Sequence, residues 1–199
     1  MIGPLALHGG GEFLAGDEPF LRALLDRAAV AASGRGAATP ALRVELLTTA
    51  VARHRPDMAF AVGSAALERV AAAAGSELPR LHLRHARVVD ETSAADTDIA
   101  ERLATADLVY LPGGDPDAVV EILVGSAALR AVAAARARGA VVAGASAGAM
   151  ALGERTWTPG GYVGGFGWAG RLVVVPHASE WRLASARGAV DLLPRGRDL

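Results

Sequence analysis

The stretch Gly144-Ala145-Ser146-Ala147-Gly148 decides how the rest of this sequence is interpreted. The apolar run at 139–143 predicts a short buried strand before it, and the run at 147–152 predicts the first turns of a helix after it. A serine between two glycines at a sharp strand-to-helix turn matches the G-x-S-x-G pattern, in which the turn lifts the hydroxyl above the sheet edge. Free N–H groups at the start of the helix would point at the same spot. The pentapeptide therefore predicts a serine nucleophile, with plain close packing of helix on sheet as the alternative.

The composition predicts one α/β domain that spans residues 1–199. The net charge is −1, 52% of the residues are hydrophobic, and the mean hydropathy is +0.30. No apolar run approaches the roughly 18 residues that a membrane span needs. We see no secretory leader and no basic run that would mark a nucleic-acid surface. We therefore expect a cytoplasmic location, with no nucleic-acid and no membrane partner.

The sequence contains no cysteine, which excludes disulfides, thiolate metal sites and a cysteine nucleophile. No two histidines stand at a metal-binding spacing such as H-E-x-x-H, so we expect no metal site. The classes of protein that remain are a cytoplasmic enzyme and a binding domain.

Strand-like and helical segments alternate along the chain, which predicts a parallel α/β sheet. The predicted strands are 2–7, 43–48, 81–89, 107–111, 140–143 and 172–175, and the predicted helices are 18–32, 56–74, 96–104, 117–124 and 127–138. Asp17 is predicted to cap the first of these helices, and the glycine-rich segment 159–170 is predicted to be a loop. No repeat or linker interrupts the pattern, which indicates a single domain.

Four glycine, serine and histidine features each follow a predicted strand: Gly9–Gly11, Gly113-Gly114, Ser146 and His177. In open parallel sheets, ligands bind outside the carboxyl ends of the strands. We therefore expect these features to meet at one edge of the sheet. That convergence favours a catalytic role for the serine over plain packing.

A serine hydroxyl needs a base to take its proton, and a histidine does this near neutral pH. His177 is the only histidine after Ser146, so we expect it to be the base; a strand-end histidine bonded to backbone is the alternative. The developing oxyanion needs hydrogen-bond donors. The N–H of Ala147 is one, because it follows the nucleophile, and Gly113 or Gly114 is best placed to supply the other.

Three segments of the chain, taken together, resemble a known family. Leu-Pro-Gly-Gly-Asp at 111–115, Gly-Ala-Ser-Ala-Gly-Ala at 144–149 and Val-Pro-His at 175–177, in that order and spacing, resemble the peptidase E and cyanophycinase family of serine peptidases. That family is similar in fold to the class I glutamine amidotransferases, a flavodoxin-like arrangement. The resemblance implies a three-layer α/β/α sandwich with a mostly parallel sheet.

The resemblance also implies a chemistry. It implies Ser146 as nucleophile, His177 as general base, and Gly114 with Ala147 as the oxyanion hole. It further implies hydrolysis of small peptides or of Asp-linked amide bonds, without a metal or cofactor.

The chain departs from the family pattern in the acid that orients the histidine. The aspartate that follows the serine in peptidase E has no counterpart at 159–162, and the glutamate that follows the histidine by two in the amidotransferases is Ser179 here. Glu180 comes one position later, so we expect Glu180 to be the orienting acid, with Glu154 as a second candidate. Glu12, just after the glycine triplet, is predicted to hold a substrate amino group.

Two other functions fit parts of the sequence. His8-Gly9-Gly10-Gly11 is similar to the HGGG oxyanion loop of lipases and esterases, which favours an α/β-hydrolase esterase; its place on the first strand argues against that. The shortened C-terminal strands and the missing acid favour a catalytically impaired binding protein on the peptidase scaffold. A shortened chain of this kind could also be completed by a homodimer partner.

Overall fold

A five-stranded parallel sheet forms the centre of the computed structural model, which describes residues 1–34 and 41–179. The strand order is β1-β5-β4-β2-β3. The strands are β1 (Leu5–His8), β2 (Ala41–Leu47), β3 (Arg80–Ala86), β4 (Leu108–Leu111) and β5 (Val141–Ala145). Every residue of β4 and β5 is buried, as expected where helices cover both faces of a parallel sheet.

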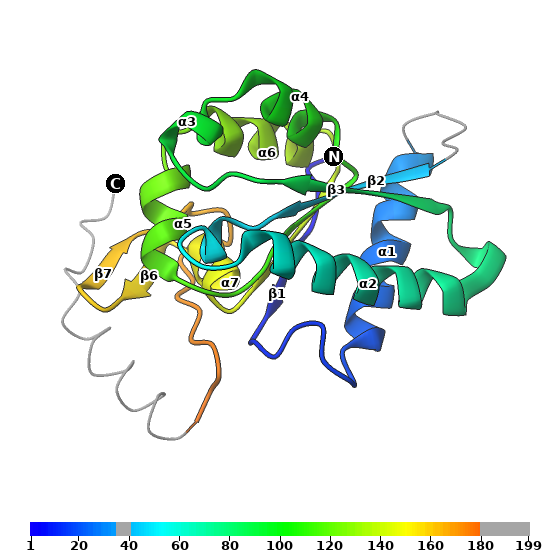
Figure 1. The fold of residues 1–199 in the computed structure, drawn as a ribbon, viewed down its shortest axis with the longest axis horizontal. Coiled ribbons are helices and arrows are strands. Elements are labelled where there is room, and N and C mark those ends of the chain that lie inside the picture. Colours follow the sequence, from blue (N-terminus) through cyan, green and yellow to red (C-terminus); the bar gives the residue numbers. More distant parts are fainter. Residues whose placement is uncertain (35–40, 180–199) are drawn as a thin grey trace.

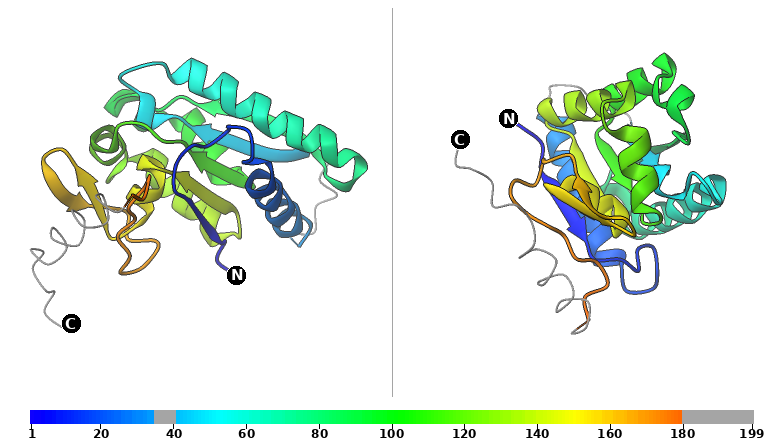
Figure 2. Two further views of the ribbon diagram at one scale, coloured as in Figure 1. Left: turned by 90° about the horizontal axis from the view of Figure 1, so that it is seen from below. Right: turned by 90° about the vertical axis from the view of Figure 1, so that its left-hand side faces the viewer.

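Helices cover the sheet on two sides and make the expected three-layer α/β/α sandwich (Figures 1 and 2). One face carries α1 (Glu18–Ser33) and α2 (Pro56–Ala74). The other carries α3 (Glu91–Ala94), α4 (Thr97–Thr105), α5 (Pro116–Leu123), α6 (Ala127–Ala137) and α7 (Ala147–Leu152).

The division of the helices follows from the handedness of the connections. The chain crosses the sheet in one direction from β1 through β2 to β3, and then returns through β4 to β5. Because crossovers between parallel strands are right-handed, a reversal of direction moves the connecting helices to the opposite face. The carboxyl ends of all five strands consequently lie along one edge of the sheet.

The predicted elements from the first strand to the helix after Ser146 are present, with ends shifted by a few residues. The helix predicted at 56–74 has those bounds in the structure. Two short helical turns, η1 (Thr49–Val51) and η2 (Gly75–Glu77), and the four-residue α3 were not predicted. They are too short to show a helical period. With η2, α2 has the length and the mean hydropathy (1.2) of a membrane span, a property that core helices also have.

Two predictions for the last described part of the chain are wrong. The segment 159–170 is not all loop, because β6 (Arg155–Thr158) and β7 (Gly161–Gly164) form an antiparallel hairpin outside the main sheet. The segment 172–175 is not a strand: its only pairing among the described residues is an isolated bridge from Val173 to Arg155. Its apolar pattern arises from packing, since Val174 contacts the core beneath α5–α7.

The predicted cap of the first helix is also wrong. Asp17 occupies the N-cap position of α1, but its side chain makes no capping hydrogen bond. Its carboxylate instead accepts a hydrogen bond from the N–H of Phe13 at 2.8 Å and lies 3.0 Å from Nε2 of His8. Asp17 therefore stabilises the loop between β1 and α1 and does not cap the helix that follows it.

Candidate active site

Ser146 stands at the turn between β5 and α7, in a backbone conformation that is rare for a residue with a side chain. Its φ is 46° and its ψ is −111°, and such strain costs on the order of 1–3 kcal/mol. Both glycines of the pentapeptide are needed for the turn. A Cβ on Gly144 would lie 2.6 Å from the carbonyl carbon of Gly148, and a Cβ on Gly148 would lie 2.2 Å from the carbonyl oxygen of Leu111. The N–H of Ser146 donates to the carbonyl of His8 at 3.0 Å, which fixes the turn to β1.

The structure brings His177 to Ser146, although 172–175 is not a strand. Oγ of Ser146 and Nε2 of His177 are 3.1 Å apart. The backbone N–H of His177 donates to the carbonyl of Gly9 at 2.7 Å, so the histidine is held over the end of β1. A Cβ on Gly10 would lie only 2.2 Å from Cε1 of the imidazole. Gly10 thus provides the space in which the ring of His177 rests.

The loop that carries Gly10 is held by a half-buried histidine, His8, paired with a buried aspartate, Asp17. The N–H of Gly10 donates to Nδ1 of His8 at 3.3 Å, and Nε2 of His8 lies 3.0 Å from Asp17. Asp17 is 8% exposed and also accepts from the N–H of Phe13. His8 therefore carries its proton on Nε2 and positions the glycine loop. This role of His8 was not predicted from the sequence, because a loop of unknown shape does not show which of its polar groups come into contact.

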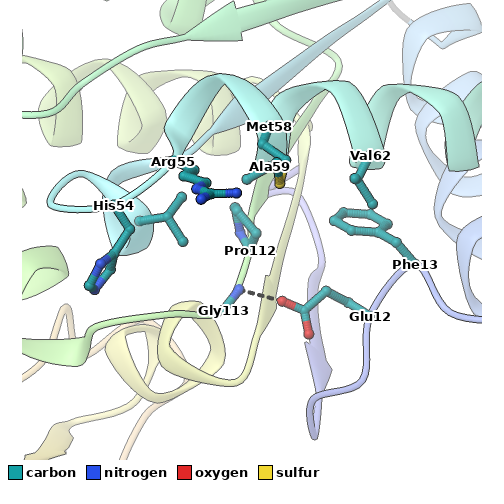
Figure 3. Close-up of a pocket in the computed structure, with 10 residues that line it drawn as sticks. Glu12, Phe13, His54, Arg55, Met58, Ala59, Val62, Pro112 and Gly113 are labelled. Atoms are coloured by element: carbon teal, nitrogen blue, oxygen red, sulfur yellow. Dashed lines mark hydrogen bonds between the residues drawn. The ribbon is translucent and has the colours of Figure 1, made fainter.

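Gly113 borders Ser146 on the side opposite to Gly10. A Cβ on Gly113 would lie 2.9 Å from Cβ of Ser146 and 2.7 Å from Oε1 of Glu12. The N–H of Gly113 donates to that carboxylate oxygen at 2.6 Å (Figure 3). Gly114 is turned toward η1 instead, since a Cβ there would lie 2.3 Å from the carbonyl oxygen of Ala50. Of the two glycines, Gly113 is therefore the one beside the serine.

The predicted site has three further residues, Ala147, Glu180 and Glu154. Ala147 is buried and is the first residue of α7, so its N–H has no acceptor within that helix. Glu180, the predicted orienting acid, lies outside the described residues. Glu154 is exposed, and no hydrogen bond or ion pair joins it to His177 in the part of the chain that is described. Within residues 1–34 and 41–179, no group of three or more His, Asp and Glu side chains is placed to hold a metal ion.

A pocket of about 410 Å³, here called the Gly113 pocket, opens between the loop after β1, the end of β4 and the start of α2 (Figure 3). Six of its lining residues are apolar: Phe13, Val51, Met58, Ala59, Val62 and Pro112. Glu12 lies at its end beside Gly113, and His54 and Arg55 contribute its other polar side chains. The pocket therefore adjoins the candidate nucleophile.

Comparison with known proteins agrees with this fold. Residues 32–160 match the model of peptidase family S51, and this match includes Ser146 but ends before His177. The chain belongs to peptidase family S51 and is a serine-type peptidase. This membership removes the esterase alternative, and His8 is engaged with Asp17 rather than in an HGGG oxyanion loop. No curated protein matches the sequence significantly.

Two solved structures have a similar fold. The crystal structure of a peptidase from an acI-B1 Actinobacterium superposes with a TM-score of 0.74 at 22% identity, covering 92% of this chain and 75% of that one. A putative peptidase E protein from Listeria monocytogenes EGD-e gives a TM-score of 0.50 at 16% identity, covering 78% of this chain and 64% of that one. At these identities the likeness concerns the fold.

Proposed function

We propose that Ser146, activated by His177, hydrolyses amide bonds in small peptides, among them the Asp-linked bonds that the family resemblance implies. The observation that carries this proposal is the 3.1 Å separation between Oγ of Ser146 and Nε2 of His177. General-base activation needs a nucleophile and a base within hydrogen-bond reach, and this pair meets that condition. The strained turn at Ser146 supports a nucleophile elbow.

The reaction then has two acyl-transfer steps. Oγ of Ser146 bonds to the carbonyl carbon while Nε2 of His177 takes the hydroxyl proton, and the oxyanion receives hydrogen bonds from the N–H groups of Gly113 and Ala147. His177 returns the proton to the leaving amine as the C–N bond breaks. Water, deprotonated by His177, then attacks the acyl-serine ester, and His177 returns that proton to Oγ of Ser146 as the C–Oγ bond breaks and the acid is released. Loss of one oxyanion donor costs about 2.7–4 kcal/mol of transition-state stabilisation.

Glu12 must leave Gly113 before that donor can act. Its carboxylate now accepts the hydrogen bond that an oxyanion would need. A substrate with a free α-amino group offers the carboxylate a cationic partner in exchange, and hydrogen bonds to charged groups contribute about 1.5–3 kcal/mol. This supports the predicted role of Glu12 in holding a substrate amino group.

The remaining parts of the proposal rest on the sequence alone. Glu180 stays the predicted acid that orients His177. In serine proteases, loss of the acid that orients the histidine lowers turnover by about 10⁴. Gly114 as an oxyanion donor, a cytoplasmic location and a homodimer likewise stay predictions.

A fluorophosphonate probe tests the proposal. We expect the probe to label the wild-type protein, and Ser146→Ala or His177→Ala to abolish labelling. Ser33→Ala and His82→Ala are the matched controls, because both side chains are exposed and lie outside the site. Wild-type protein that is folded by circular dichroism but never labelled would favour the catalytically impaired binding protein instead.

A further inference from the structure

We infer that the Gly113 pocket binds the side chain of the substrate's first residue, and that this side chain is large and apolar. The inference rests on the proposed function, because it takes Ser146 as the nucleophile and His177 as the group that protonates the leaving amine. It ranks the substrates of that function: bonds after a large apolar first residue are cleaved in preference to the aspartate-linked bonds that the family resemblance implies.

The order of the strands decides which part of the substrate reaches the pocket. Along the edge of the sheet, His177 is held at the end of β1, Ser146 follows β5, Gly113 follows β4, and η1 follows β2. The leaving amine must face His177, so it lies toward β1. The residue that supplies the scissile carbonyl consequently extends the other way, over Gly113, where the pocket opens between β4, η1, α2 and the Glu12-Phe13 part of the loop after β1.

Glu12 determines which substrate residue places its side chain beside the Gly113 pocket. Its carboxylate touches the N–H of Gly113, which is the proposed donor to the scissile carbonyl. An α-ammonium group is separated from its own carbonyl by a single carbon, so an ammonium paired with Glu12 belongs to the residue being cleaved. The side chain on that same carbon then has the Gly113 pocket beside it.

The walls of the pocket favour an apolar side chain. Phe13 is 9% exposed and packs closely on α2, where a Cβ on Gly63 would lie 3.0 Å from its ring. Met58 and Val62 project from the same helix and are 53% and 50% exposed, which leaves large apolar surfaces uncovered beside the site. Burial of apolar surface against them is favourable, and one methylene more or less in such a pocket changes specificity by about 10–200-fold.

The charges of the pocket do not favour an aspartate. Glu12, at the end of the pocket beside Gly113, would repel the side-chain carboxylate of a substrate aspartate. Arg55 is the one arginine among the lining residues, and it is exposed at the N-cap position of α2. An exposed guanidinium pairs weakly with a carboxylate, because water screens the interaction. The volume of about 410 Å³ also exceeds what an aspartate side chain fills.

Fluorogenic 7-amino-4-methylcoumarin amides of leucine, phenylalanine, alanine and aspartate test the inference on the full chain. We expect kcat/KM for the leucine and phenylalanine amides to exceed that for the alanine amide by at least about tenfold, with the aspartate amide lowest. Ala59→Trp, which fills the pocket, should lower kcat/KM for phenylalanine at least about tenfold more than for alanine. Ala65→Trp is the matched control, since Ala65 is exposed on the same helix outside the pocket and should leave all four values unchanged.

Two results would overturn the inference while leaving the proposed function intact. In the first, Ser146 is labelled by the fluorophosphonate but the aspartate amide is the preferred substrate, and Arg55→Ala removes that preference. In the second, Ala59→Trp lowers kcat/KM equally for all four amides. Absence of labelling in the wild-type chain would instead remove the proposed function, and with it this inference.

Discussion

Oε1 of Glu12 accepts a hydrogen bond from the N–H of Gly113 at 2.6 Å, in the space beside the hydroxyl-bearing Cβ of Ser146. The two residues are separated by about a hundred positions in the sequence, and the contact places a carboxylate where the proposed chemistry develops negative charge. In this structure, the N–H of Gly113 therefore has Glu12 as its acceptor. Under the proposed mechanism, a substrate must draw this carboxylate away before Gly113 can donate to the oxyanion.

Glu12→Gln separates the contact of this side chain with Gly113 from its proposed contact with a substrate amino group. The amide oxygen can still accept from Gly113, but it offers no charge to an α-ammonium group. We expect KM for a peptide with a free amino terminus to rise roughly 10–100-fold with little change in kcat, as for the loss of one charged hydrogen bond. Steady-state kinetics on free and N-acetylated forms of one peptide provide the measurement. An equal effect on both forms would contradict a contact with the amino group.

Gly10→Ala tests whether the imidazole of His177 needs the space above this glycine. A Cβ there would lie 2.2 Å from the ring, so the ring must shift away from Ser146. We expect kcat to fall about a hundredfold or more, the usual effect of misplacing a catalytic group by 1 Å. The control is Gly16→Ala: Gly16 also has a positive φ (95°), but nothing lies within 4 Å of the added methyl. If both variants lost activity equally, backbone strain rather than the ring contact would be the cause.

Asp17→Asn tests the pair that holds the glycine loop. The amide can still accept from Phe13, but it gives His8 a neutral partner in place of a buried carboxylate. We expect the free energy of unfolding to fall by about 1–3 kcal/mol, measured by urea denaturation. Asp26→Asn, which breaks a partly exposed i,i+4 pair with Arg22, should change it by about 0–1 kcal/mol. Equal effects would mean that the loop pair contributes no more than a surface ion pair.

His85 predicts a pH dependence of stability. Burial lowers the pKa of His85, despite an opposing effect from nearby Asp57. Near the ordinary histidine pKa of about 6.5, the unfolded chain therefore binds more protons than the folded one, and stability falls as the pH falls below that value. His85→Gln should flatten this slope in urea titrations between about pH 5 and 8, whereas His82→Gln, at an exposed position, should not. An unchanged slope in His85→Gln would show that another group titrates.

The strand–serine–helix turn was predictable because every feature that makes it is local. Gly144, Ser146 and Gly148 are within five positions of one another, and small residues are required wherever backbones approach this closely. The long helix α2 was equally predictable, since its apolar residues repeat with a helical period between Pro56 and Gly75. The family resemblance added the layer order of the sandwich.

The last described segment shows where such reasoning fails. The apolar run at 172–175 has the composition of a strand, but a strand also needs a neighbour with free backbone groups, and pairing with a distant segment leaves no local signal. His177 nevertheless reaches Ser146 through one backbone hydrogen bond to Gly9. The expected proximity of His177 to Ser146 is therefore present in the structure, although the strand predicted at 172–175 is not.

By itself, the sequence determined the alternation of strands and helices, the turn at Ser146 and the edge of the sheet at which reactive groups collect. These depend on residue size, backbone preference and short-range periodicity. Only the tertiary structure decided that Gly113, and not Gly114, borders the serine. It also decided that Glu12 accepts the hydrogen bond of the Gly113 N–H, and that Asp17 pairs with His8 instead of capping α1. Those contacts join loops that follow different strands, and their partners are chosen by the packing of the whole sheet, which no single segment encodes.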